Sequence, residues 1–352
     1  TGRAARKMSE SIGEKAYTIH SFLNLGYEDR RMDEETDVEI ENALVVIDES
    51  SMIGIHLMQK LLHAIKEGCC VVFSGDINQL PSVEAGRVLQ DMIDSRLMPV
   101  LHLKKVHRQN EDDVIFENAK RINEGNEKIL NGNDFAFHEI KSVMEMRNTM
   151  AEIYVKRVKQ YGLGNVMCLC PHKEQIGGVE DMNEELQRRL NPMDEWKDEC
   201  RIHGVTFRTG DPVMHIVRNT EEASNGDLGV IEQITYQRDG RPVISVYIND
   251  NTVEYSGEKL DWLTLAYAMT IHKSQGSEAE AVVFCISDVH RRMLYRSIPY
   301  VAVSRGKKKV DAVGKMDAMQ EAIRNKKSIF RISMLGYFLK YHGGKEFIPL
   351  YE

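Results

Sequence analysis

The sequence predicts an α/β protein of two parallel-sheet domains, with a small β-barrel inserted into the second. Three observations support this prediction: a strand–helix–strand pattern near the N-terminus, an apolar strand at Val166–Cys170 at which the α/β pattern starts again, and short strands clustered between Gly204 and Tyr255. The length of 352 residues agrees with it, because one hydrophobic core seldom organises so long a chain.

The first strand is the apolar run that ends at Asp48 and Glu49, and such a run predicts a strand buried on both faces. Leucines at helical spacing follow it, and residues 70–73 then form a second buried strand, which completes a βαβ unit. The two acids therefore stand at the carboxyl end of a strand, where open α/β sheets bind ligands. We expect a further strand at residues 101–103.

The pattern changes after a helix that we expect over residues 179–190. Short strands alternate there with turn signals such as Asn225-Gly226-Asp227 and Asp239-Gly240, which is typical of a small β-barrel. The expected barrel strands are residues 213–217, 230–234, 243–248 and 252–255. The α/β pattern resumes with strands at 282–286 and 310–313, so the barrel is an insertion.

The composition excludes several classes of protein. Lys and Arg number 46 against 54 Asp and Glu, and the net charge of −8 argues against coating nucleic acid by bulk charge, although a locally basic cleft could still hold DNA. The six cysteines contain no CxxC pair, which favours reduced, buried thiols over a zinc site. No apolar run is long enough to cross a bilayer and no signal peptide is recognisable, so we expect a cytoplasmic protein with no membrane partner.

Two motifs indicate nucleotide chemistry. Residues 45–49 have the form of a Walker B strand, in which Asp48 helps to hold Mg²⁺ and Glu49 orients or deprotonates a water that attacks the γ-phosphate. Residues 75–81 follow the next strand; Gly75 permits close backbone approach there, and Gln79 can sense a terminal phosphate. The alternative is a strand that merely ends in a solvated acidic turn.

With these motifs the chain resembles the superfamily 1 helicases, and among them the RecD-like superfamily 1B DNA helicases, which include the exodeoxyribonuclease V alpha subunit. The resemblance runs through most of the chain and rests on these segments: Thr1-Gly2-Arg3-Ala4-Ala5, Thr18-Ile19-His20, Asp48-Glu49-Ser50-Ser51-Met52, residues 75–81, Val106-His107-Arg108-Gln109, residues 225–230, residues 270–278 and Tyr300-Val301-Ala302-Val303-Ser304-Arg305-Gly306. It implies two RecA-like P-loop NTPase domains, the first truncated, with an SH3-like β-barrel in the second. The expected boundaries are 1–107 for the first domain, with an exposed hairpin at about 26–42, then 108–200 and 263–325 for the second, 201–262 for the barrel and 326–352 for a C-terminal extension.

The resemblance implies ATP and Mg²⁺ as cofactors and assigns roles to particular residues. The catalytic set is Asp48, which is also the metal ligand, Glu49, Gln79, Arg108 and Arg305; the nucleotide-binding set is Gly75, Asp76, Gly276 and Glu278. The two arginines would act as paired fingers that neutralise phosphoryl charge, unless they are ordinary surface arginines. Glu278 would meet the ribose or a bridging water, unless it is a solvated charge after a turn.

A third set of residues would line a path for single-stranded DNA. Its members offer hydroxyls, backbone amides and cations, which hold phosphates without reading sequence. The set is Gly2, Arg3, Thr18, His20, Thr270, His272 and Lys273. The alternative for the two histidines is a buried, hydrogen-bonded ring with no DNA contact.

The resemblance implies an ATP-dependent 5′-to-3′ DNA helicase of recombination and repair. Its partners would be single-stranded DNA and duplex junctions, with RecB- and RecC-like subunits as candidates. Two alternatives stay open: the helicase part of a conjugative relaxase, and a non-catalytic subunit that binds DNA or a partner. The retained acids, glutamine and arginines argue against the non-catalytic alternative.

One expected motif is absent, because no Gly-x-x-x-x-Gly-Lys-Ser/Thr occurs in the sequence. This phosphate loop supplies the backbone amides and the lysine that cradle the β- and γ-phosphates. In the family that the chain resembles it precedes Thr1, so we expect the 352-residue chain to be a fragment that starts just after it.

We therefore predict that the 352-residue chain does not hydrolyse ATP, with or without DNA. ATP turnover and nucleotide affinity measured on this chain test the prediction. Turnover that DNA stimulates above background would show that other residues form a phosphate site.

Overall fold

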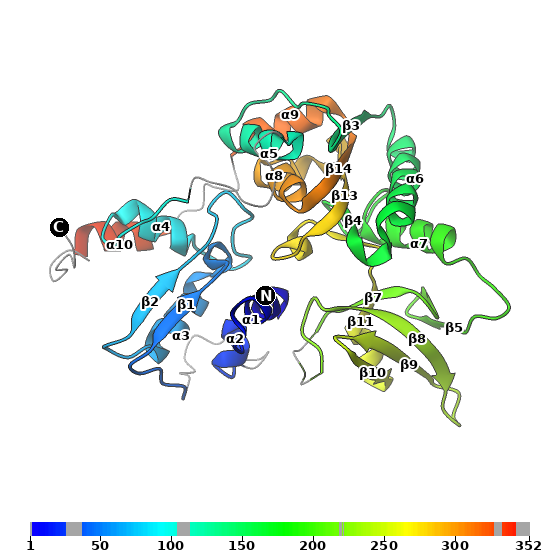
Figure 1. Cartoon of the computed structure of the whole chain (residues 1–352), viewed down its shortest axis with the longest axis horizontal. Coiled ribbons are helices and arrows are strands. Elements are labelled where there is room, and N and C mark those ends of the chain that lie inside the picture. Colours follow the sequence, from blue (N-terminus) through cyan, green and yellow to red (C-terminus); the bar gives the residue numbers. More distant parts are fainter. Residues whose placement is uncertain are drawn as a thin grey trace.

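The computed structural model describes residues 2–25, 37–103, 113–217, 220, 222–326 and 333–342. These residues form two α/β domains and a β-barrel (Figure 1). None of their helices combines the length and the apolar character that a membrane-spanning segment needs.

The first domain contains a two-stranded parallel sheet of β1 (Leu44–Ile47) and β2 (Cys70–Phe73), joined through α3 (Ile55–Ala64). Helix α3 forms as its leucine spacing predicts and packs on one face of the sheet. The other face is bare, because Leu44 is 67% and Val46 50% exposed. The prediction that this strand is buried on both faces is therefore wrong: in the described part of the chain, helices cover one face alone.

The remaining helices of the first domain are α1 (Gly2–Ile12), α2 (Ile19–Phe22) and α4 (Val88–Ser95). The C-terminal helix α10 (Leu335–His342) lies beside α4 (Figure 1), so the end of the described chain returns to the first domain.

The strand predicted at residues 101–103 does not form. Leu101 and Leu103 are 85% and 88% exposed and belong to no strand. A leucine–histidine–leucine alternation satisfies the two-residue period of a strand, but this one pairs with no sheet edge among the described residues.

The second domain has a five-stranded sheet in which every pair of neighbours is parallel. In spatial order the strands are β12 (Ala268–Thr270), β4 (Val166–Cys170), β13 (Ala279–Ile286), β14 (Gly306–Gly314) and β3 (Phe135–Glu139). The strands predicted at 166–170, 282–286 and 310–313 are confirmed as β4 and as parts of β13 and β14.

Helices cover both faces of this sheet, as the continuous apolar strands predict. Alternate residues of β13 point to opposite faces: Val282 and Phe284 join one core, whereas Ala281 and Val283 join the other. The first core is covered by α5 (Val114–Glu124), α8 (Ser297–Ser304) and α9 (Met316–Arg324), and the second by α6 (Val143–Tyr161) and α7 (Val179–Leu190).

The barrel leaves the second domain after α7 and returns to it at β12, which confirms that it is an insertion. Its antiparallel strands are, in spatial order, β10 (Asn251–Ser256), β9 (Pro242–Ile248), β8 (Leu228–Tyr236), β7 (Pro212–His215) and β11 (Leu263–Leu265), and a hairpin of β5 (Glu199–Ile202) and β6 (Val205–Arg208) adds to its core. The four predicted strands are confirmed. The expected barrel boundaries of 201 and 262 need correction, because β5 begins before the first and β11 pairs with β7 beyond the second.

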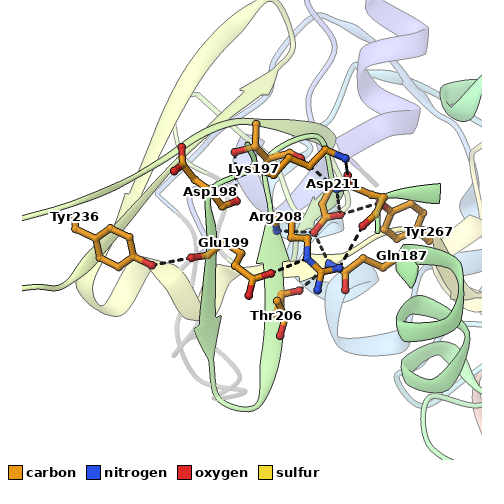
Figure 2. Close-up of polar contacts among 11 residues, drawn as sticks. Gln187, Lys197, Asp198, Glu199, Thr206, Arg208, Asp211, Tyr236 and Tyr267 are labelled. Carbon is orange, nitrogen blue, oxygen red and sulfur yellow. Dashed lines mark hydrogen bonds and ion pairs between the residues drawn. The ribbon is translucent and has the colours of Figure 1, made fainter. Parts of the chain in front are cut away.

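A buried carboxylate joins the barrel to the second domain (Figure 2). Asp211 is fully buried and accepts hydrogen bonds from the Gln187 amide at 2.5 Å, the Tyr267 hydroxyl at 2.8 Å, and the Asn191 side chain and Arg208 backbone N–H at 2.7 Å each. Burial, together with the neighbouring carboxylate, raises the pKa of Tyr267 and keeps its hydroxyl a donor. The donors come from α7, from β6 and from the segment after β11, so one carboxylate holds three parts of the chain.

We predict that Asp211→Ala lowers the free energy of unfolding by about 3 kcal/mol or more, because it leaves several buried donors unpaired at about 1–3 kcal/mol each. The matched control is Asp261→Ala, which removes an exposed barrel carboxylate paired with His203 and should cost less than about 1 kcal/mol. Urea unfolding followed by circular dichroism measures both. Equal losses in the two variants would contradict the role of Asp211.

Candidate functional site

The turn after β1 places the predicted acids at the edge of the first sheet. Ser50 is buried, and its hydroxyl lies 2.8 Å from the carbonyl oxygens of both Ile47 and Ser74. Its backbone N–H also donates to the Ser74 carbonyl at 2.8 Å, so Ser50 holds together the ends of both strands. Beside it, Asp48 is exposed and Glu49 is half-buried, with a left-handed φ of 53°.

The turn after β2 lies directly against the first turn. A Cβ on Gly75 would come within 3.0 Å of the backbone nitrogens of Ser50 and Ser51 and 2.9 Å of a Leu89 methyl, so this close approach requires glycine. Asp76 shapes the rest of the turn: its Oδ1 accepts from the Asn78 N–H at 2.9 Å. The sequence prediction that Gly75 allows close backbone approach therefore has a geometric basis, and the approach is to the turn that carries Asp48 and Glu49.

Gln79 and Ser51 line a small pocket beside these turns, together with Arg87. The Gln79 Oε1 and the Ser51 Oγ are both buried and, within the described part of the chain, have no hydrogen-bond partner. Buried polar atoms without partners are rare and call for an explanation such as a ligand or a catalytic role. We name the two turns, residues 48–52 and 74–81, the acidic corner.

The acidic corner also contacts the second domain. The Tyr300 hydroxyl on α8 donates to Asp76 Oδ2 at 2.7 Å, and the Gln275 side-chain amide donates to the Leu80 carbonyl at 3.1 Å. Leu80 is itself fully buried within the core of the second domain. Asp76, assigned to the nucleotide in the sequence analysis, thus makes a contact between the domains.

Of the two predicted arginine fingers, the structure describes Arg305 alone. Arg108 lies outside the described residues. Arg305 is buried in the second domain, where its guanidinium donates to the backbone carbonyls of Ser277 at 3.2 Å and Val301 at 3.4 Å. Two of its nitrogens, Nε and one Nη, are thereby bonded to backbone of its own domain.

Glu278 also makes charge contacts that the sequence did not predict. Its carboxylate pairs with Lys7 of α1 at 3.7 Å and with Lys307 at 3.2 Å. The ion pair with Lys7 links the N-terminal helix to the second domain. Gly276, two residues earlier, has a φ of 71°, a left-handed turn conformation that favours glycine.

Three of the DNA candidates, Thr270 at the end of β12 and His272 and Lys273 just after it, lie together at the carboxyl edge of the second sheet. The Thr270 hydroxyl accepts from the Lys273 N–H at 3.2 Å, and the Lys273 ammonium lies 3.7 Å from the Met214 sulfur. Burial lowers the pKa of His272 below its ordinary 6.5, so its ring is neutral at pH 7 and would meet a phosphate as an N–H donor. Lys173, which the sequence analysis missed, is close enough to repel Lys273 and helps to lower its pKa after the effect of burial.

The N-terminal DNA candidates lie on α1 and α2. A Cβ on Gly2 would come 2.6 Å from Ser224 Cβ, so Gly2 packs against the barrel, where Arg6 also pairs with the buried Asp227 at 2.9 Å. The Thr18 hydroxyl caps α2 by accepting from the Ser21 N–H at 3.2 Å, and His20 is exposed. Arg3 is part of α1, but its side chain lies outside the described residues.

The structure therefore assembles two groups out of the predicted residues. Asp48, Glu49, Gly75, Asp76 and Gln79 belong to the acidic corner, and Thr270, His272 and Lys273 form a second group at the carboxyl end of β12. Arg305 and Glu278 belong to neither group and are held by contacts of their own. Lys173 and Lys7 had no sequence signal, and Tyr300 stood in a recognised segment without an assigned role, because each contacts a partner distant in the chain.

The acidic corner fits one half of an Mg²⁺–nucleotide site. An exposed Asp48 carboxylate is the kind of ligand that Mg²⁺ takes, and Gln79 has a side-chain oxygen to spare. No group of three or more His, Cys, Asp or Glu side chains gathers as a metal site in the described residues. All six cysteines are free thiols; four are buried as predicted, whereas Cys70 is exposed.

Comparison with solved structures first defines the class of protein. A Pif1 helicase from Bacteroides in complex with ADP-AlF3 and single-stranded DNA matches with a TM-score of 0.54 at 20% identity, covering 86% of this chain and 80% of that one. A structure of two Pif1 helicases coordinating at forked double-stranded DNA matches with a TM-score of 0.53 at 19% identity, over 89% and 79% of the two chains. The chain shares the fold of these helicases, with RecA-like domains.

Sequence comparison identifies the family. Three family descriptions match: an AAA domain over residues 1–141, the SH3 domain of ATP-dependent RecD-like DNA helicases over 182–247, and the UvrD-like helicase C-terminal domain over 265–313. The ATP-dependent RecD2 DNA helicase of Deinococcus radiodurans is 30% identical over 95% of this chain, and the RecBCD enzyme subunit RecD of Mycolicibacterium smegmatis is 27% identical over 92%. The chain spans 45% of the first relative and 62% of the second. It belongs to the RecD-like family of superfamily 1B helicases.

Proposed function

We propose that this chain is the motor part of an ATP-dependent DNA helicase that moves 5′ to 3′ along a single strand and acts in recombination and repair. The observation that carries the proposal is the acidic corner, where Ser50 and Gly75 hold Asp48, Glu49 and Gln79 at one edge of the first sheet. Family membership supports the same function, because the Deinococcus radiodurans relative is named an ATP-dependent DNA helicase.

Asp48 would hold Mg²⁺, which supplies charge neutralisation at the phosphates when it is bound. Glu49 is placed one residue further along the turn, where its carboxylate can orient a water and take its proton. The Gln79 Oε1 can accept a hydrogen bond from that water. Arg305 and Arg108 would supply positive charge from the second domain.

The group at the carboxyl end of β12 would hold the DNA. Thr270, the neutral ring of His272 and the Lys273 ammonium offer donors of three kinds within a few residues, and Lys173 strengthens the local positive potential. A chain with a net charge of −8 attracts DNA through such a local patch rather than through its overall charge. Domain closure and opening would then alternate the grip on the phosphates.

Partner subunits follow from the same relationship. The Mycolicibacterium smegmatis relative is named a subunit of the RecBCD enzyme, so RecB- and RecC-like proteins are candidate partners of the protein that contains this chain. Single-stranded DNA and forked duplexes are the proposed substrates, in line with the DNA named for the two solved Pif1 structures.

We predict that Glu49→Gln lowers ATP turnover by roughly 10²- to 10⁴-fold, the range for loss of a general base, while ATP binding stays nearly intact. The assay uses a form of the protein that includes a phosphate loop and measures steady-state hydrolysis alongside nucleotide affinity. Glu67→Gln, an exposed glutamate of the same domain, is the matched control. Normal turnover in Glu49→Gln would exclude Glu49 from the mechanism.

We predict that Lys273→Ala weakens binding to single-stranded DNA equally for all sequences. It should also reduce the slope of log affinity against log salt by about 0.7, the effect of one lost phosphate contact on a single strand. Fluorescence anisotropy over a salt series measures the slope, with the exposed Lys159 of α6 replaced by alanine as the control. An unchanged slope in Lys273→Ala would place the DNA elsewhere.

A further inference from the structure

Tyr300 reaches from one domain to the other. Its ring is half-buried against the core of the second domain, and its hydroxyl donates to Asp76 Oδ2 in the acidic corner at 2.7 Å. The two residues are 224 positions apart in the chain, so the bond exists only through the packing of the domains. We propose that Tyr300 is a positioning residue, which sets the turn that carries Gln79 according to the position of the second domain.

The Asp76 carboxylate connects the Tyr300 hydroxyl to the turn that carries Gln79. Its Oδ1 accepts from the Asn78 N–H at 2.9 Å and closes the turn, while its Oδ2 takes the Tyr300 hydroxyl. The two oxygens belong to one rigid plane, so a displacement of the Tyr300 hydroxyl that rotates the plane also moves the acceptor of Asn78. Gln79 follows Asn78 directly, and its own N–H donates to the Asp76 carbonyl at 3.2 Å.

The other end of the turn is held from the second domain as well. The Gln275 side chain donates to the Leu80 carbonyl at 3.1 Å, and the Leu80 side chain is fully buried in the core of the second domain. Gln79 therefore lies between two points, Asp76 and Leu80, that the second domain holds. The turn is attached to the first domain at its start, where Ser50 donates to the Ser74 carbonyl and Gly75 lies close to Ser50 and Ser51.

This arrangement couples the Gln79 side chain to domain closure. When the domains are together, the Tyr300 hydroxyl and the Gln275 amide fix the turn; when they separate, both bonds break and the turn relaxes. Loss of one hydrogen bond to a charged acceptor changes such an equilibrium by about tenfold or more. The consequence for catalysis rests on the proposed ATP-driven function, whereas the contact itself does not.

The first experiment tests the contact in the 352-residue chain without nucleotide. Tyr300→Phe removes the hydroxyl and keeps the ring, and the matched control is Tyr295→Phe, whose hydroxyl contacts the Met293 sulfur of its own domain. We expect hydrogen exchange of the Asn78 and Gln79 amides to become about tenfold faster in Tyr300→Phe and to stay as in the wild type in Tyr295→Phe. Wild-type exchange in Tyr300→Phe would overturn the proposal. Asp76→Ala removes the same bond from the other side and must also speed exchange at Gln79.

The second experiment measures ATP turnover in a form of the protein that includes a phosphate loop. We expect Tyr300→Phe to lower the DNA-stimulated kcat by about tenfold with the KM for ATP changed by less than about twofold, because the hydroxyl contacts the turn and not the nucleotide. Faster exchange combined with a wild-type kcat would overturn the positioning role. If the wild-type protein shows no DNA-stimulated turnover, the proposed function fails, and the exchange result still decides the Tyr300 contact.

Discussion

The placement of the barrel depends on one buried carboxylate. Between α7 and β12 the chain leaves the second domain, builds a separate sheet and must return in register beside β4. Asp211 takes donors from both sides of this excursion, Gln187 before it and Tyr267 after it. Asn183 of α7 makes a second connection to the returning chain: its side-chain amide donates to the Leu265 carbonyl, and its side-chain oxygen accepts from the Ala268 N–H. These bonds hold the two ends of the insertion together, so β12 pairs with β4 and the parallel sheet of the second domain is not interrupted.

The sequence predicted those parts of the fold in which local pattern and burial agree. Strand β4 and residues 281–286 of β13 are continuous apolar runs because both of their faces are covered, and such runs are recognisable without knowledge of the neighbouring strands. Strand β3 was missed because Phe135–Glu139 ends in polar residues, and its place at the edge of the sheet depends on its pairing with β14. The sequence does not show which elements pack beside a strand. For that reason a strand was wrongly predicted at residues 101–103, and β1 was wrongly predicted to be buried on both faces.

In the candidate site as well, some residues were predictable from the sequence, whereas the contacts that hold them were not. Asp48, Glu49 and Gln79 were predictable because each follows a recognisable strand, and strand ends share one edge of a parallel sheet. The partners of Glu278 were not predictable, since Lys7 and Lys307 approach it from two separate segments. Lys173 has no motif of its own, and it becomes relevant through its position beside Lys273. Sequence motifs thus located the chemical groups, whereas the contacts that hold them required the folded chain.

Helix α10 gives the molecule a property that neither domain has alone. It follows the second domain in the chain but packs on α4 of the first, where Leu335 joins the apolar cluster around Val88. The second domain is therefore linked to the first by the chain that precedes it and, through the packing of α10 on α4, by the chain that follows it. From Lys326 to Ser333 the backbone can span at most about 25 Å, even when fully extended. While α10 stays packed on α4, this length limits how far the two domains can separate.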